Sequence, residues 1–236
     1  VVFVGGISPQ LEGEEMPIEI SGFKGGDRTN IELPKVQRNF LKALKEAGKK
    51  VVFVNCSGSA IALTPETESC DAILQAWYPG QEGGEAVARV LFGEYNPAGK
   101  LPITFYKNSE QLPDFKDYSM KGRTYRYMND ALFPFGYGLS YTSFRIGDAT
   151  LSNSILKKGE KITLKVPVSN VGKKDGTEVV QVYVKDPADT EGPLKSLKAF
   201  ERVEVKAGKT AEAVITLDSR NFELFDAATN TVRAKA

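Results

Sequence analysis

The sequence predicts an α/β domain, built on an open and mostly parallel sheet with flanking helices, followed by an all-β sandwich. Up to residue 143, short β-branched runs alternate with segments whose apolar residues recur at helical spacing. This alternation is typical of a parallel sheet covered on both sides. From residue 144 onward, apolar and polar residues alternate one by one, as in half-buried antiparallel strands. We therefore predict one domain over residues 1–143 and a second over residues 144–236.

Four short segments of the first domain have the character of strands. Residues 1–4 and 51–54 are β-branched runs too short for helices, and they suit strands buried on both faces. Residues 72–77 and 101–105 are expected to add two further strands. Together these segments would form the parallel sheet.

Two segments between these strands have the character of helices. A helix is expected to begin at Leu33-Pro34, because proline is favoured near the first turn, and to end at Gly48. Its apolar stripe consists of Val36, Phe40, Leu41 and Leu44. A second helix is expected over residues 83–92, with an inward face made of Ala86, Val87, Val90 and Leu91.

The second domain shows period-two alternation in three runs, at residues 162–168, 180–184 and 211–215. Glycines separate the runs, as expected for turns between strands. About 100 residues and roughly seven strands would suit a sandwich of the immunoglobulin-like type.

Composition excludes several classes of function. A chain of 236 residues with 41% hydrophobic residues can bury a sizeable core in one or two domains. A net charge of +1 gives no reason to expect nucleic acid or an anionic membrane as a partner. The chain has no histidine, which excludes Ser-His-Asp and Cys-His catalysis and the commonest zinc ligand. Catalysis would therefore depend on carboxylates, tyrosine, lysine or groups outside the chain.

The two cysteines and one sequon favour buried structure over modification. Cys56 and Cys70 are too few for a disulfide scaffold, and we expect buried free thiols rather than a bridge. Asn55-Cys56-Ser57 matches a glycosylation sequon, but it closes an apolar strand and should be buried. The glycines near residues 58 and 80–84 form no phosphate-binding motif, so nucleotide binding is not expected.

The loop over residues 5–30 is the candidate site of chemistry, because ligands of open parallel sheets bind beyond the carboxyl ends of the strands. It holds three carboxylates within four residues, Glu12, Glu14 and Glu15. Their mutual repulsion would raise the proton affinity of at least one, as a general acid at neutral pH requires. A solvated acidic loop is the simpler alternative.

Two motifs resemble the C-terminal half of a family 3 glycoside hydrolase. They are Tyr78-Pro79-Gly80-Gln81-Glu82-Gly83-Gly84 and the aromatic run over residues 132–144, which begins Leu132-Phe133-Pro134-Phe135-Gly136-Tyr137-Gly138. Further blocks in the same order resemble that family at residues 26–28, 33–37, 51–54, 91–105 and 123–127. Residues 144–236 resemble the fibronectin-III-like module of the family, with at least one more strand expected beyond Ala236.

The resemblance implies an exo-acting retaining β-glycosidase with an aspartate nucleophile on a barrel domain of about 250 residues ahead of Val1. It also implies that Glu14 is the acid/base, since Gly13-Glu14 is the best positional match. Glu12 is the second choice and Glu15 the third. The eleven residues from Met16 to Gly26 make this loop longer than in many members.

Three other residues of the first domain have two interpretations each. Arg28 could pair with Asp27 or hold the acidic loop, or it could contact the sugar directly. Trp77 and Tyr78 could be a sugar-stacking platform, although packing is the commoner role of such a pair.

The resemblance favours a β-xylosidase acting on xylo-oligosaccharides from the non-reducing end. A bifunctional xylosidase and arabinofuranosidase is a variant of this interpretation. The alternatives are a β-glucosidase of the same family and a noncatalytic structural or carbohydrate-binding fragment. No metal and no organic cofactor are implied. The implied partners are an oligosaccharide of β-linked xylose or glucose and the barrel domain of the same enzyme, and the implied location is periplasmic or extracellular.

Overall fold

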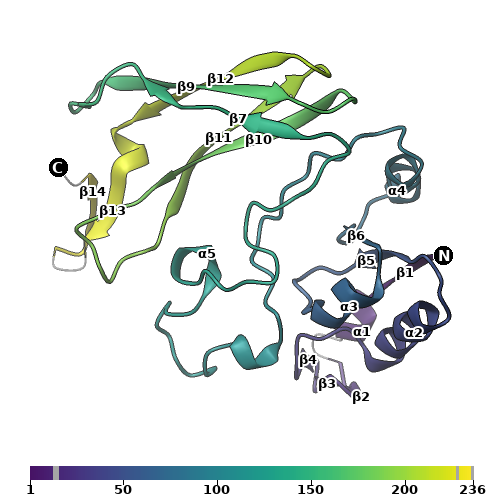
Figure 1. The fold of residues 1–236 in the computed structure, drawn as a ribbon. Helices are drawn as coiled ribbons and strands as arrows, with labels where there is room; N and C mark the ends of the chain where they lie inside the picture. The colour runs from purple at the N-terminus through teal and green to yellow at the C-terminus, as the bar shows by residue number, and fades with distance from the viewer. Residues whose placement is uncertain (13–15, 227–228, 235–236) are drawn as a thin grey trace. The chain divides into compact units, whose positions relative to one another are not determined.

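The computed structural model describes residues 1–12, 16–226 and 229–234. Its contacts divide the chain into two compact units, shown in Figure 1. The first unit comprises Val1–Leu91 and Pro102–Phe135, and the second comprises Phe92–Leu101 and Gly136–Ala236. The chain therefore leaves the first unit, enters the second for ten residues, and returns before it enters the second again.

A parallel sheet forms the centre of the first unit. Its strands are β1 (Val2–Gly6), β5 (Val52–Cys56) and β6 (Ala72–Gln75), in the order β1-β5-β6. The predictions of strands at 1–4 and 51–54 are thus confirmed. Burial on both faces is wrong for the first of them, because β1 lies at the edge of the sheet and its Val2 and Val4 are exposed. Phe53 and Val54 of the central strand are fully buried, as expected for a strand covered on both faces.

The described part of the first unit contains six helical segments. They are α1 (Pro9–Glu12), α2 (Lys35–Glu46), α3 (Thr64–Ser69), α4 (Gly83–Leu91), η1 (Ser109–Gln111) and α5 (Thr124–Tyr127). The sequence patterns predicted two of them, α2 and α4. A short antiparallel sheet, β2 (Glu19–Ile20), β3 (Phe23–Lys24) and β4 (Asp27–Arg28), lies within the long loop after β1. The sequence patterns did not predict this small sheet.

The apolar stripe predicted for α2 is only partly correct. Leu41 is fully buried, whereas Val36 is 76% exposed. Phe40 is half exposed, but its ring lies 5.5 Å from that of Phe3 on β1, so the helix does pack on the sheet. In α4, the predicted inward residue Ala86 is exposed.

Two strand predictions need correction. Strand β6 ends at Gln75 rather than residue 77, because Trp77 adopts a left-handed φ of 59° that ends the extended conformation. Residues 101–105 form no strand: only Phe105 makes a bridge, to Phe133. Pro102 lacks the N–H that a strand interior needs. The N–H of the neighbouring Leu101, which already belongs to the second unit, donates to the carbonyl of Tyr137 in the same unit.

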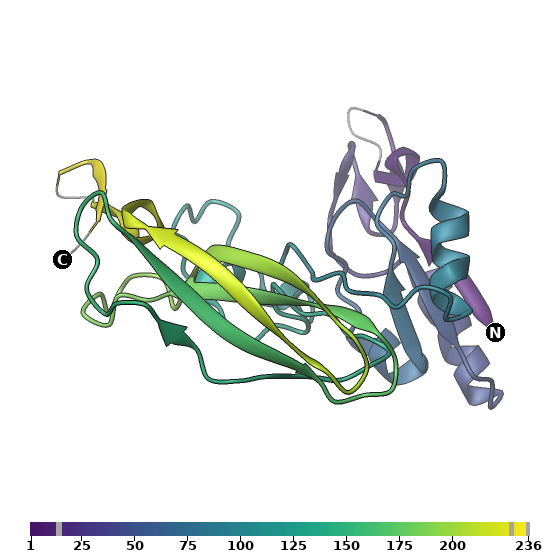
Figure 2. The ribbon, with the colours of Figure 1, turned by 90° about the horizontal axis from the view of Figure 1, so that it is seen from above.

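The second unit contains two facing sheets and a short terminal hairpin. The long strands of the two sheets are visible in Figures 1 and 2. One sheet has the order β12-β9-β7, with β8 also paired to β9, and the other is β10-β11. The strands are β7 (Phe144–Ile146), β8 (Thr150–Leu151), β9 (Lys161–Asn170), β10 (Gly176–Val184), β11 (Ser196–Val205), β12 (Thr210–Asp218), β13 (Glu223–Asp226) and β14 (Thr231–Ala234), with η2 at Ser219–Phe222.

Alternating residues from the two sheets form one core. It contains Ile162, Val166 and Val168 of β9, Val180 of β10, Val203 and Val205 of β11, and Ala213, Ile215 and Leu217 of β12. This is the inward/outward alternation of an aligned sandwich. The prediction of an antiparallel sandwich is therefore confirmed.

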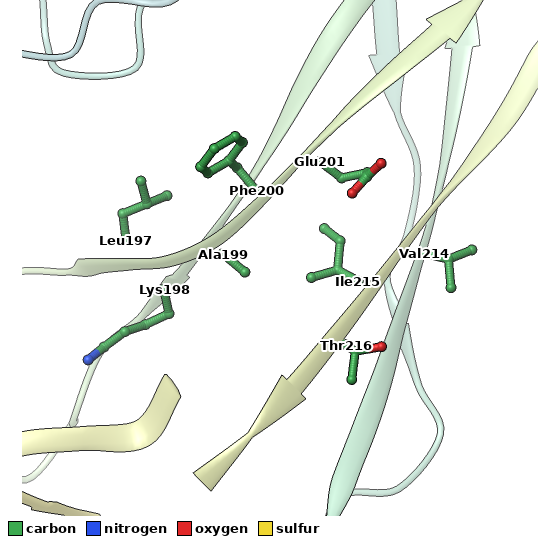
Figure 3. Close-up of a pocket in the computed structure, with 8 residues that line it drawn as sticks. All are labelled: Leu197, Lys198, Ala199, Phe200, Glu201, Val214, Ile215 and Thr216. Atoms are coloured by element: carbon green, nitrogen blue, oxygen red, sulfur yellow. The ribbon is translucent and has the colours of Figure 1, made fainter. Parts of the chain in front are cut away.

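A hollow of about 450 Å³ lies along β11 and β12. Figure 3 shows that Phe200 and Ala199 of β11 and Val214 and Ile215 of β12 are among its lining residues. The ammonium of Lys198 donates to the carbonyl of Glu223. Glu201 and Thr216 also line the hollow, so its wall mixes apolar and polar side chains.

Candidate functional site

The base of the candidate loop is fixed at Gly6, the last residue of β1. The N–H of Gly6 donates to Oε1 of Gln37 at 2.8 Å, and Nε2 of Gln37 donates to the carbonyl of Gly6 at 2.7 Å. Gly6 has a φ of 122°, and a Cβ there would lie 2.0 Å from the carbonyl oxygen of Cys56. Only glycine fits this position without a shift of the backbone.

Glu12, at the end of α1, is bound from two other loops. The hydroxyl of Tyr78 donates to Oε2 of Glu12 at 2.8 Å. The hydroxyl of Ser59 donates to Oε1 at 3.3 Å. Ser59 follows β5 and Tyr78 follows β6, so the carboxylate joins segments that leave all three strands of the sheet at their carboxyl ends.

A buried polar network organises the loop that carries Ser59. Asn55 and Ser57 are both fully buried, which confirms that the sequon is inaccessible. Nδ2 of Asn55 donates to Gln75 at 2.6 Å and to the hydroxyl of Ser57 at 3.2 Å. The Ser57 hydroxyl in turn donates to the carbonyl of Ser59 at 2.9 Å. The backbone of Ser59 is therefore anchored to β5 and β6.

Arg28, on β4, reaches the same loop. Its Nη1 donates to the Ser59 hydroxyl at 2.9 Å and to the Ala60 carbonyl at 3.3 Å. Nε and Nη2 are buried and have no hydrogen-bond partner in the part of the chain that the structure describes. Burial lowers the pKa of Arg28, and the negative charges of Glu12 and Glu32 oppose that change.

Tyr78 is held as a neutral hydrogen-bond donor. Burial, together with its bond to Glu12, raises the pKa of Tyr78 to about 12. Its ring lies against Gly58, where a Cβ would come within 2.6 Å of the ring. The glycine thus makes room for the tyrosine. Because 38% of the residue is exposed, it stands at the rim of the site.

The structure brings Glu12 and Arg28 together through Ser59, which accepts from the arginine and donates to the carboxylate. Glu14 and Glu15 lie outside the described residues, so the choice of Glu14 as acid/base stays a prediction. Asp27 lies opposite Lys24 in the register of strands β3 and β4. No ion pair joins Asp27 to Arg28 among the described residues.

The remaining candidates of the first unit have structural roles. Trp77 is partly buried, and its ring packs edge-on against Phe105 at 6.1 Å, in line with a packing role. Both cysteines are free, as predicted, and Cys70 is buried whereas Cys56 is partly exposed. In the described part of the chain, no group of three or more metal-ligating side chains gathers. No described helix combines the length and apolar character needed to cross a membrane.

Sequence reasoning missed Gln37 and Ser59. Gln37 directly follows Val36 of the apolar stripe predicted for α2, and nothing in its spacing signals a bond to Gly6. For Ser59 a weak signal existed, since Ser57-Gly58-Ser59 directly follows a predicted buried strand, where loop residues of a parallel sheet meet ligands.

Comparison with known proteins identifies the family. The model of the glycosyl hydrolase family 3 C-terminal domain matches residues 1–141. The chain belongs to glycoside hydrolase family 3. The model of a fibronectin type III-like domain matches residues 178–236.

The relatives within family 3 include proteins named as xylosidases and proteins named as glucosidases. A xylan 1,4-beta-xylosidase of Xylanibacter ruminicola is 66% identical over 235 residues, which cover 100% of this chain and 27% of that protein. A periplasmic beta-glucosidase of Salmonella typhimurium is 42% identical, over 84% of this chain and 28% of that protein. The chain thus spans less than a third of these two relatives.

A solved structure of a relative has the same fold. The beta-glucosidase of Kluyveromyces marxianus in complex with glucose superposes with a TM-score of 0.82 at 32% identity, over 100% of this chain and 29% of that one. A beta-glucosidase of Listeria innocua in complex with glucose gives a TM-score of 0.79 at 29% identity, over 99% of this chain and 33% of that one. The order of parallel sheet and β-sandwich is therefore that of family 3.

Proposed function

We propose that this chain is the C-terminal part of an exo-acting retaining β-xylosidase, which removes xylose from the non-reducing end of xylo-oligosaccharides. The observation that carries the proposal is the 66% identity, over the whole chain, to a protein named xylan 1,4-beta-xylosidase. A β-glucosidase of the same family is the second candidate, favoured by the 42% identity to the Salmonella protein.

In this proposal two carboxylates perform the reaction. An aspartate on the barrel domain of the same enzyme attacks the anomeric carbon, and Glu14 protonates the departing oxygen. Glu14 then removes a proton from the water that hydrolyses the covalent intermediate. Retaining enzymes place their two carboxyl groups about 5 Å apart. The reaction requires no metal and no organic cofactor.

Glu14 is preferred to Glu12 because the Glu12 carboxylate is already engaged. Each of its oxygens accepts a hydrogen bond from the protein, one from Tyr78 and one from Ser59. An acid that must give a proton to a leaving group needs a carboxyl oxygen directed at that group. Glu12 is the alternative acid/base, and Glu15 the third.

Arg28 is the proposed substrate-binding residue of this chain. Two of its nitrogens, Nε and Nη2, are buried without a partner among the described residues, and they can donate to sugar hydroxyls. We also propose that the enzyme is exported to the periplasm or the exterior, in line with the name of the Salmonella relative.

The test is the ratio of kcat/KM for 4-nitrophenyl β-xyloside and β-glucoside, measured with the full-length protein. A pocket fitted to xylose has no room for the hydroxymethyl group of glucose, so the xyloside should be preferred by well over the roughly 10- to 200-fold that a methylene contributes. A preference for glucoside would select the second candidate. The 236-residue chain alone should hydrolyse neither substrate, because the nucleophile is assigned to the barrel domain. Turnover by the chain alone would overturn that assignment.

A further inference from the structure

The Glu12 clamp consists of Tyr78 and Ser59, whose hydroxyls donate to the Glu12 carboxylate, and of Arg28, which donates to the Ser59 hydroxyl. Glu12 is the last described residue before Glu14, and only Gly13 separates the two in the sequence. Glu12 is therefore the nearest point at which the structure ties the loop to the sheet ahead of Glu14.

Tyr78 reaches Glu12 through a strained turn. Trp77 directly precedes it and has a φ of 59°, a conformation that costs energy for a side chain of this size. Such strain persists only where the surroundings enforce it, and here the Trp77 ring packs against Phe105 while the Ala76 N–H bonds to the Asn55 carbonyl. This turn places the Tyr78 hydroxyl 2.8 Å from Oε2 of Glu12.

The Tyr78 hydroxyl is available as a hydrogen-bond donor at neutral pH. Tyr78 keeps its proton well above neutral pH, since its pKa is raised to about 12. A hydroxyl that donates to a carboxylate forms one of the stronger hydrogen bonds of proteins. The second contact to Glu12 comes from Ser59, whose hydroxyl is itself aligned by the Arg28 guanidinium.

We propose that Tyr78 is a positioning residue for the acid/base: by holding Glu12 it fixes the start of the segment that carries Glu14. This inference rests on the proposed function, in which Glu14 is the acid/base. Tyr78 itself is not assigned a contact with substrate. Its effect should therefore fall on the proton-transfer step, in which a misplacement of about 1 Å can cost as much as 100-fold in rate.

The test is Tyr78→Phe in the full-length protein, assayed on two glycosides of the same sugar. Dinitrophenyl glycosides need little protonation to depart, whereas phenyl glycosides depend on the acid. For Tyr78→Phe we expect kcat/KM on the phenyl glycoside to fall by about tenfold or more, and on the dinitrophenyl glycoside by less than about threefold. Added azide should not restore activity, because the Glu14 carboxylate is still present.

Tyr183→Phe is the matched control. The Tyr183 hydroxyl donates to Oε1 of Gln181 at 2.6 Å within the second unit, so the variant loses the same hydroxyl and a hydrogen bond to a neutral side-chain oxygen. It should leave the ratio of the two substrates unchanged. If Tyr78→Phe does not fold, Ser59→Ala removes the other contact to Glu12 and should shift the ratio in the same direction, but less, since that bond is 3.3 Å long.

A double-mutant cycle separates positioning through Glu12 from a direct role. If Tyr78 acts only through Glu12, then Tyr78→Phe combined with Glu12→Ala should be no slower than Glu12→Ala alone. Additive losses would overturn the proposal. So would equal losses on both substrates together with a lower Tm, or no loss on either substrate.

Azide rescue of the Glu12 and Glu14 variants distinguishes a failure of the proposed function from a failure of the positioning role of Tyr78. Azide rescue of Glu12→Gln, with none for Glu14→Gln, would make Glu12 the acid/base and Tyr78 its direct hydrogen-bond partner. That result would overturn the positioning proposal. Leaving-group dependence and rescue in Glu14→Gln, with a changed substrate ratio in Tyr78→Phe, would support both.

Discussion

Replacing Arg38 with methionine should strongly destabilise the first unit. Arg38 on α2 donates from Nε to Oε1 of Glu66 at 2.7 Å and from Nη2 to Oε2 at 3.2 Å. The Glu66 side chain is only 1% exposed, whereas that of Arg38 is 25% exposed. Methionine retains most of the apolar contact of the arginine stem but leaves the buried carboxylate without its cation.

The expected loss is about 3 kcal/mol. Removing one partner of a buried ion pair typically costs about 3–5 kcal/mol, because the remaining charge stays buried without compensation. We take the lower end of that range because water can reach the site through the partly exposed Arg38 position. Lys42→Met is the matched control: Lys42 and Glu46 form an exposed pair at 3.8 Å, and its loss should cost at most about 0.5 kcal/mol.

Urea unfolding followed by tryptophan fluorescence measures this difference. Trp77 is the one tryptophan of the chain and lies in the first unit, so its signal reports on that unit. Urea is preferred to guanidinium chloride because a salt would screen the ion pairs under comparison. A loss for Arg38→Met below about 1 kcal/mol, or one equal to that of Lys42→Met, would refute the assignment of a buried pair that depends on its partner.

Three further predictions follow from the site and its surroundings. In the full-length protein, Glu14→Gln should slow poor leaving groups far more than dinitrophenyl glycosides and should be rescued by azide, whereas Glu12→Gln should not be rescued. Gly6→Ala should lower the free energy of unfolding by about 3 kcal/mol or more, because the new Cβ would meet the main chain of β5 at 2.0 Å. Gly48→Ala, at a φ of 69° with open space around it, should cost only about 1–2 kcal/mol in the same urea experiment. Burial raises the pKa of Cys70 to about 11, so its thiol should resist iodoacetamide at pH 8 and react only as the pH rises toward that value; rapid alkylation at pH 8, seen by mass spectrometry of the native protein, would contradict the burial.

The parts of the fold that the sequence predicts well are those in which burial follows a regular period. The strand at residues 51–54 and the alternation at 162–168 were predicted because a strand buried on both faces and one buried on a single face leave distinct patterns. The strand expected at residues 101–105 is absent, although its apolar residues are of the same kind. A pattern of burial does not show which backbone groups pair. Here the Leu101 N–H donates to the Tyr137 carbonyl, and the Leu101 carbonyl accepts from the Gly136 N–H.

The candidate site was predictable only in its location. The rule that ligands bind beyond the carboxyl ends of parallel strands pointed to the loop after β1. The contacts that organise that loop come from Gln37, Ser59 and Tyr78, which are distant in sequence from Glu12. Polar side chains of this kind have no periodic signature, since one hydrogen bond depends on the positions of just two atoms. Their partners therefore required the three-dimensional structure.

The ten residues 92–101 have a consequence for any attempt to exchange modules between relatives. Lys100 pairs with Glu178 at 2.8 Å, and the Asn96 side chain donates to the Asp175 carbonyl and accepts from the Ser140 hydroxyl. These partners all belong to the second unit. A chimera that took its β-sandwich from another family member but kept its own residues 92–101 would place Lys100 and Asn96 against a sandwich of different sequence. Recombination that moves residues 92–101 together with residues 136–236 keeps each of these side chains with its own partner. The module to exchange is therefore one compact unit made of two separate stretches of sequence.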